Sequence, residues 1–351
     1  GNDTLISIVN TTERGKAVKI RFIEALNSRE VLDFNIYMSP YDVWTAAVTA
    51  DGEGAKMMTY DTTCTVPYFY DADAGFGEQE FLDFEYAEFD GTEATESDGG
   101  PQGIERTASG YIEVIEMGTM IEGAKTGEGR VEYNSKHVAG VPRDCNALVD
   151  AWTTNLKDDT TTPMGSIWAG TDTASGNTSY GLDQDAGPTG GIYGAASIIN
   201  IADGTMFSYN ATAIDGFYAR TGDHHTEPGS LLPSLAEGNV DTSNVFVAGS
   251  VETHEWSIPL YALNATLTHD KLMNEYVFGG VADARTEWVV TFPTKRFHVD
   301  VQTQGLTPDA PVAPFTNTWH VGTDKKLNYA CEDLTFKFYD REERPDPVTP
   351  D

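Results

Sequence analysis

The chain has 351 residues and carries 55 acidic against 22 basic side chains, which gives a formal net charge of −33. This charge argues against nucleic-acid binding, because phosphate recognition depends on Lys and Arg. It argues equally against electrostatic attachment to an anionic membrane. Hydrophobic residues make up 40% and aromatic residues 11% of the chain, which is too apolar for a disordered acidic tail. We therefore expect a folded body of one large domain or two intimate ones.

The N-terminal part, residues 1–125, predicts strands joined by short turns. Residues 4–9 are rich in β-forming side chains, and apolar residues alternate with polar ones in 16–23, 30–37 and 111–120, the pattern of half-buried strands. Turn sequences such as Ser39-Pro40 and Asp51-Gly52 separate some of these runs. The pattern indicates a mainly β fold, an antiparallel β-sandwich of Ig-like or jelly-roll type with long acidic loops and one or two short helices.

Residues 71–98 combine acidic and aromatic side chains. Nine acids and no base occur between Glu78 and Asp98. One interpretation is a solvated loop or edge hairpin, and the other is a Ca²⁺-binding loop, because Ca²⁺ takes clustered carboxylate oxygens. The segment 71–75 has the D-x-D-x-G start of a calcium loop without the full twelve-residue pattern. The candidate ligands are Asp71, Asp73, Asp83, Asp90 and Asp98.

Residues 126–190 predict an insertion made of a helix and a long loop. A helix over 145–152 would place Leu148, Val149 and Trp152 on one face, with Asp144 as its N-cap. The following loop contains Trp168, the tryptophan that we expect to be exposed and able to stack on a sugar.

The C-terminal part, residues 191–351, begins with a predicted hairpin around Asp203-Gly204, a sequence preferred in type I′ turns. Residues 259–276 are ambiguous between helix and loop. Residues 287–292 predict a strand that Pro293 ends, and alternation of apolar and polar side chains predicts a last strand over 334–340. We expect Trp44 and Trp288, which lie in apolar strand context, to belong to the core.

Histidine and cysteine provide the remaining candidate ligands. His224 and His225 follow Asp223 and, with His254, would make a transition-metal site if the fold gathered them; the alternative is a polar loop. Cys64, Cys145 and Cys331 allow one disulfide with one thiol left over, or three free thiols.

Motifs of common enzyme classes are missing or out of context. The chain has no G-x-S-x-G sequence, and the glycine-rich residues 187–191 precede a strand, so they indicate a turn rather than a phosphate loop. Residues 291–296 are the most basic segment, and we expect a structural ion pair there rather than a catalytic lysine. A hydrolase with paired carboxylates stays open, because no linear pattern selects such a pair among 55 acids.

Several stretches resemble a group of secreted, uncharacterised β-rich proteins of Gram-negative bacteria. They are residues 6–12, 18–22, 27–35, 190–194, 204–206, 287–295 and 339–343. The resemblance spans most of the chain and implies export to the cell surface or the extracellular medium, but it implies no activity. It also implies that a segment precedes the first strand, so we expect a mature or clipped form.

These observations favour a non-enzymatic extracellular structural protein, a self-assembling surface-layer or filament subunit stabilised by divalent cations. Its expected partners are copies of itself, because strand edges offer unpaired backbone groups. A calcium-assisted glycan-binding protein is the first alternative and a secreted hydrolase the second. We expect no membrane insertion, since no apolar run approaches the roughly 18 residues that span a bilayer.

Overall fold

The structure is a computed structural model of the chain. It describes residues 1–26, 28–82, 103–123, 130–152, 182–183, 187–218, 224–277, 279, 285–299, 315, 320–321, 328–329, 332–340, 342 and 344. Within these residues the fold is mainly β, and all paired strands are antiparallel. The prediction of a mainly β, antiparallel fold is therefore confirmed.

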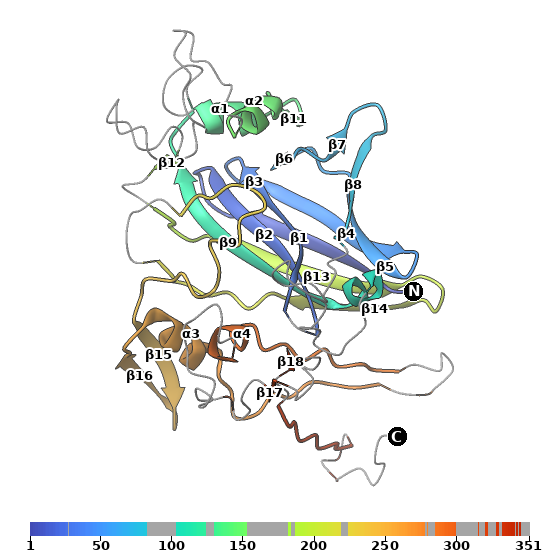
Figure 1. Cartoon of the computed structure of the whole chain (residues 1–351), viewed down its shortest axis with the longest axis vertical. Coiled ribbons are helices and arrows are strands. Elements are labelled where there is room, and N and C mark those ends of the chain that lie inside the picture. Colours follow the sequence, from blue (N-terminus) through green and yellow to red (C-terminus); the bar gives the residue numbers. More distant parts are fainter. Residues whose placement is uncertain are drawn as a thin grey trace.

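One sheet of the described chain has seven strands (Figure 1). Their order across the sheet is β14 (Thr205–Asn210), β13 (Ile192–Asn200), β1 (Asp3–Asn10), β4 (Val43–Asp51), β5 (Gly54–Thr59), β8 (Phe76–Glu80) and β7 (Tyr70–Asp71). β1 lies in the middle and pairs with β4 on one side and β13 on the other. The sheet thus joins the predicted N-terminal and C-terminal parts of the chain.

A second sheet of the described residues has five strands. Their order is β12 (Leu182–Asp183), β9 (Gly110–Met120), β2 (Lys16–Glu24), β3 (Glu30–Met38) and β6 (Cys64–Val66). The strands predicted at 16–23, 30–37 and 111–120 are confirmed as β2, β3 and β9.

Apolar side chains of both sheets form one core. From β2, the inward residues are Val18, Ile20 and Phe22, each at most 3% exposed. Phe34 of β3 lies 4.9 Å from Phe69, measured between ring centroids. Each large apolar side chain buried in this way contributes roughly 1.5–3 kcal/mol to folding.

The opposite face of the five-stranded sheet is covered as well. There Tyr37 and Met117 pack with Leu148 of α2 (Asn146–Asp150), in a cluster that also includes Val131 of α1 (Arg130–Ser135). Figure 1 shows both helices at one end of the sheets. The helix predicted at 145–152 is confirmed, and the Asp144 carboxylate accepts the Ala147 N–H at 3.2 Å.

This double covering corrects one prediction. β2 was expected to be half-buried, yet all nine of its residues are buried, including Lys16, Lys19 and Arg21. The polar residues alternate as predicted, but residues far along the chain cover them. Sequence alternation shows which side chains share a face, and it does not show whether that face meets water.

The remaining described elements are short. They are the 3₁₀ helix η1 (Ile104–Ala108), the strand pair β10 (His137–Val138) and β11 (Val141–Pro142), the hairpin β15 (Thr242–Val247) and β16 (Ser250–Glu255), the helices α3 (Pro259–Leu267) and α4 (Arg296–Val299), and the pair β17 (His320–Val321) and β18 (Asn328–Tyr329). The ambiguous segment 259–276 thus begins with a helix. None of the helices in the described ranges is long and apolar enough to cross a membrane.

The strands predicted at 287–292 and 334–340 are wrong. The structure assigns no strand to 285–292 or 332–338, only an isolated bridge at Tyr339. Trp288 is 42% exposed instead of lying in the core, and it contacts Phe336, which is 49% exposed. A sequence rich in β-forming side chains becomes a strand only where another strand pairs with it and a second layer packs on its apolar face. Trp44, in contrast, is fully buried as predicted.

Candidate functional site

The structure pairs two of the three cysteines. Cys64 of β6 and Cys145, which precedes α2, form a disulfide with an S–S distance of 1.97 Å across 81 residues of sequence. The bond fastens the edge strand of the five-stranded sheet to the helix that covers it. Cys331 lies outside the described residues.

The predicted calcium ligands are only partly within the described chain. Asp71 and Asp73 occupy the turn between β7 and β8, where the Asp71 carboxylate accepts the N–H groups of Asp73 at 2.8 Å and Ala74 at 3.3 Å. Asp71 therefore closes the turn. The remaining candidates, Asp83, Asp90 and Asp98, lie outside the described residues, as does Trp168. Among described residues, no group of three or more His, Cys, Asp or Glu side chains is placed to hold a metal ion.

The two adjacent histidines face different surroundings. The His224 ring stacks on Tyr218 with 3.8 Å between centroids. His225 is buried, and its Nε2 lies 2.7 Å from the Tyr37 hydroxyl. His254 lies on the exposed strand β16, 3.4 Å from Glu252. The fold does not bring these histidines together, and Asp223 lies outside the described residues.

A buried charged row, which the sequence analysis did not identify, crosses the outer face of the five-stranded sheet. It consists of Lys19, Arg21, Glu30, Asp33 and Glu113. Lys19 Nζ lies 3.2 Å from Asp33 Oδ2, and Arg21 Nη1 lies 3.0 Å from Glu113 Oε2. Arg21 also pairs with Glu30. Every cation of the row thus has a carboxylate partner.

A segment that we call the strap, residues 224–234, covers the end of this row that contains Lys19 and Asp33. Its backbone accepts hydrogen bonds from Lys19 Nζ, at Glu227 O (2.7 Å), and from Asn35 Nδ2, at Thr226 O (2.8 Å). The N–H of Gly229 donates to the Asp33 carboxylate at 2.6 Å. The strap therefore replaces the water that would otherwise solvate the charges.

Burial shifts the pKa values of groups in this row and of His225 beside it. Burial lowers the pKa of Lys19, against the opposing attraction of Asp33. Burial raises the pKa of Glu30. Burial and the nearby charge of Lys19 lower the pKa of His225 to about 3. Buried groups whose pKa values are shifted are typical of functional sites, but they also occur in structural networks of ion pairs. The close cover favours the structural interpretation.

One cluster has the residue types of a serine hydrolase. Ser39 Oγ lies 3.2 Å from His137 Nδ1, and Asp42 Oδ2 lies 3.6 Å from the same nitrogen. A catalytic triad requires the serine and the carboxylate on opposite ring nitrogens, so that the histidine can relay a proton. Ser39 is also only 5% exposed. This geometry does not support hydrolysis at Ser39.

Two further segments, which could be taken for anion sites, each bind a carboxylate side chain of the same chain. The backbone N–H groups of Thr189 and Gly190 donate to Glu116, at 3.0 and 2.7 Å, so the glycine-rich turn binds a side chain of its own chain. In the basic segment, Lys295 Nζ lies 3.3 Å from Glu332 Oε1. The ion pair expected there is confirmed.

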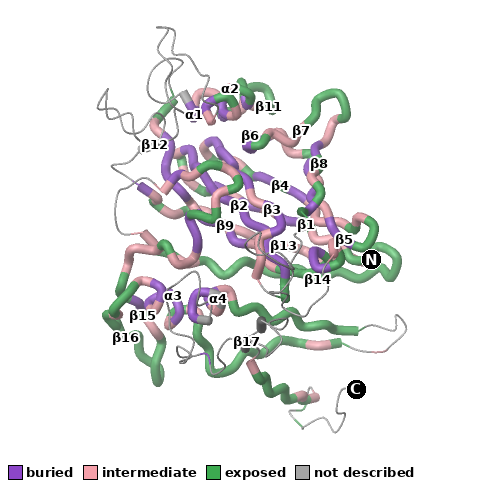
Figure 2. Tube along the Cα trace, viewed as in Figure 1, coloured by how far each residue is buried: buried purple, intermediate pink, exposed green. Residues whose placement is uncertain are grey.

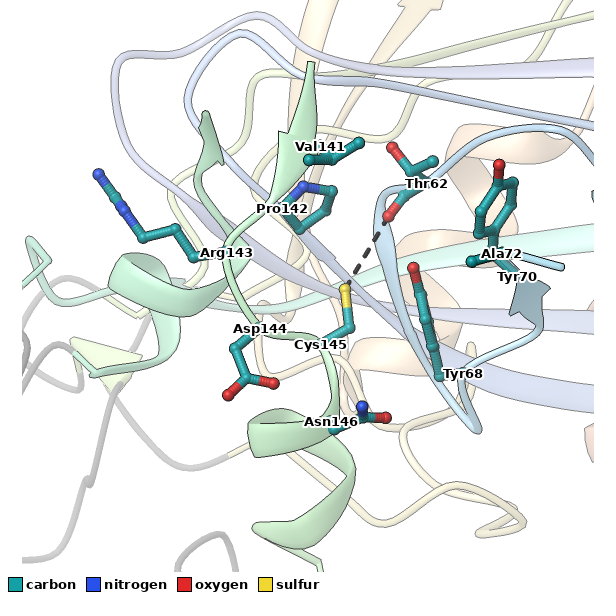
Figure 3. A pocket seen from close by; sticks show the side chains of 10 residues that line it. All are labelled: Thr62, Tyr68, Tyr70, Ala72, Val141, Pro142, Arg143, Asp144, Cys145 and Asn146. Atoms are coloured by element: carbon teal, nitrogen blue, oxygen red, sulfur yellow. Dashed lines mark hydrogen bonds between the residues drawn. The ribbon is translucent and has the colours of Figure 1, made fainter. Parts of the chain in front are cut away.

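A shallow pocket of about 280 Å³ lies beside the disulfide (Figure 3). Residues 62–72 form one side, with Tyr68 and Tyr70, and residues 141–146 form the other. The two groups come from distant parts of the chain, and no local sequence motif marks the pocket.

The free edge of the seven-stranded sheet is the last candidate. β14 is exposed along its whole length, with Met206 68%, Phe207 51% and Tyr209 44% exposed. Within the described residues it pairs with β13 and with no other strand, and Figure 2 shows its residues as exposed. β13 and β14 contain no charged residue. Natural edge strands usually carry charges, prolines or bulges that prevent further pairing.

Comparison with family models, curated proteins and solved structures finds no match to this chain.

Proposed function

We propose that this chain is a non-enzymatic extracellular structural protein whose copies assemble through the free edge of β14. The observation that carries the proposal is the exposed, uncharged and apolar character of that edge. Its unpaired backbone groups can extend the sheet into a second copy, and Met206, Phe207 and Tyr209 can be buried in the same step.

The charge of the chain supports this choice of surface. Two copies that each carry −33 repel one another over most of their surfaces. The hairpin 192–210 contains one charged residue, Asp203, which lies in its turn. Approach along β14 therefore meets less like-charge repulsion than approach along the acidic segments. Divalent cations and salt would weaken the remaining repulsion.

A repeating assembly also needs a second, different surface. Residues 288–292 belong to no helix or strand and are uncharged and exposed, with Val289 64% and Val290 40% exposed. Pairing of this segment with β14 of the next copy is a head-to-tail contact, and such contacts form filaments when they do not close into a ring. Pairing of β14 with β14 would instead stop at a dimer.

The finer architecture and the location belong to the same proposal. We take the two sheets, which share one core, as an antiparallel β-sandwich of Ig-like or jelly-roll type with long acidic loops. The disulfide supports a secreted location, because such bonds persist in oxidising compartments. The resemblance to exported β-rich proteins of Gram-negative bacteria agrees with a cell-surface setting.

Sedimentation velocity and negative-stain electron microscopy test the proposal, with and without Ca²⁺ and at low and high salt. The variant Phe207→Glu/Tyr209→Glu places like charges on the edge and should leave a folded monomer. The matched control is Phe246→Glu on β15. It changes an aromatic residue that is also exposed, at 75%, but lies on another strand pair. A wild type that stays monomeric at high concentration in every condition refutes the proposal.

A further inference from the structure

The pocket beside the disulfide has a fixed aromatic side. Tyr68 and Tyr70 are two residues apart, and Phe69 between them packs edge-on against Phe34 of the core, 4.9 Å between centroids. Tyr68 and Tyr70 both line the pocket, and Tyr68 also packs against the buried cluster that contains Cys64, Cys145 and Leu148, which fixes its position. Figure 3 shows them across the pocket from Val141 and Pro142.

The charged groups at the pocket already serve the fold. Arg143 Nη1 donates to Tyr133 O at 2.8 Å, and its guanidinium carbon lies 4.3 Å from the Tyr133 ring centroid. Asp144 accepts the Ala147 N–H at the start of α2. In Figure 3 the Arg143 side chain points away from the centre of the pocket.

The polar groups left for a ligand are neutral. The side chains of Tyr68, Tyr70 and Asn146 make no hydrogen bond to another residue of the described chain. Burial raises the pKa of Tyr68, and Tyr70 and Asp61 nearby raise it further, so its hydroxyl keeps its proton. The pocket therefore offers phenol and amide groups, which both donate and accept hydrogen bonds, beside aromatic and proline surfaces.

We propose that this pocket binds one neutral sugar ring of a glycan. A pyranose presents C–H groups on one face, which suit an aromatic ring, and hydroxyls at its rim, which suit Tyr and Asn side chains. The volume of about 280 Å³ lies near the lower end of ligand pockets, so it suits a single ring. Asp61 and the net charge of −33 disfavour an acidic sugar.

The site does not depend on edge assembly. It lies between β6, β7 and β11, whereas β14 forms the opposite end of the seven-stranded sheet from β7. It also requires no metal ion, unlike the calcium-assisted site that the sequence suggested around Trp168. The disulfide between Cys64 and Cys145 holds the two sides of the pocket together.

Saturation-transfer NMR tests the inference with methyl glycosides of glucose, galactose, mannose, N-acetylglucosamine and, as the acidic probe, sialic acid. The protein is the full chain in the Phe207→Glu/Tyr209→Glu background, so that failure to assemble and failure to bind are separate results. At least one neutral glycoside should show saturation transfer without Ca²⁺, and sialic acid should show none.

Variants assign the signal to the pocket. Tyr68→Ala and Tyr70→Ala should each weaken binding at least tenfold in a titration, and Tyr68→Phe should weaken it less. The control variant Tyr41→Ala changes a tyrosine that is 67% exposed and does not line the pocket, so it should leave binding unchanged. Circular dichroism establishes that each variant is folded. The inference is overturned if no neutral glycoside shows saturation transfer or if sialic acid alone shows it. It is also overturned if both alanine variants still bind.

Discussion

The buried His225 should make the protein less stable as the pH falls. Its pKa is ordinarily 6.5 and is lowered to about 3 by burial and by the Lys19 charge. Below about pH 6.5 the histidine of the unfolded chain binds a proton, whereas the buried histidine of the native chain stays neutral. The free energy of unfolding is therefore highest above this pH and falls as the pH decreases towards about 3. At 1.36 kcal/mol for each unit of pKa shift, the full loss is about 5 kcal/mol.

The substitution His225→Gln isolates this contribution. At about pH 7 the variant should be less stable by roughly 1–3 kcal/mol, because the buried Tyr37 hydroxyl loses its hydrogen bond with His225 and keeps the one that it accepts from Trp152 Nε1. Urea unfolding of both proteins at several pH values should show this gap shrink by about 1.4 kcal/mol for each pH unit below about 6.5. His254→Gln, on an exposed strand, is the matched control. Parallel stability curves for wild type and His225→Gln would refute the reasoning.

Three further predictions concern stability. Arg21→Met leaves buried carboxylates without their cation and should cost about 3–5 kcal/mol in denaturant unfolding. Lys56→Met, at an exposed ion pair, should leave the free energy of unfolding nearly unchanged, and equal costs for the two variants would contradict a role for the buried row. Replacing Cys64 and Cys145 by Ala should lower the free energy of unfolding by about 2–5 kcal/mol, because the disulfide closes a long loop. An unchanged urea midpoint would disprove this stabilising role of the disulfide. Added NaCl or CaCl₂ should raise the melting temperature in calorimetry by reducing self-repulsion, and a flat response to both salts would contradict this.

The strands that could be predicted are those whose surroundings match their pattern. β2 and β3 alternate, and their apolar faces meet the other sheet. The segment around Trp288 has an equally apolar pattern, but no strand of the described chain pairs with it. Both kinds of segment are rich in β-forming side chains, and the long-range neighbours of each segment decide whether it forms a strand.

The candidate sites were less accessible to sequence reasoning for the same reason. In the sequence, Lys19 belongs to the solvent side of an ordinary strand, and only the strap, some 200 residues later, shows that it is covered. Tyr68 and Asn146 form one pocket only because the fold and the disulfide unite their segments. The edge strand β14 was predicted as part of a hairpin, yet its place at the end of a sheet depends on the pairing of β13 with β1.

That pairing has a consequence for how the chain reaches its native state. β1 is synthesised well before its neighbour β13, which begins at Ile192, so Val9 and Tyr193 meet across more than half of the 351 residues. Pairings between residues so distant in sequence make folding slow, because the intervening chain must be ordered before they form. Until then one side of β1 offers Ile6, Ile8 and their backbone to any other extended segment. We therefore expect the newly made chain to depend on a partner that shields β1 until residue 200 is available.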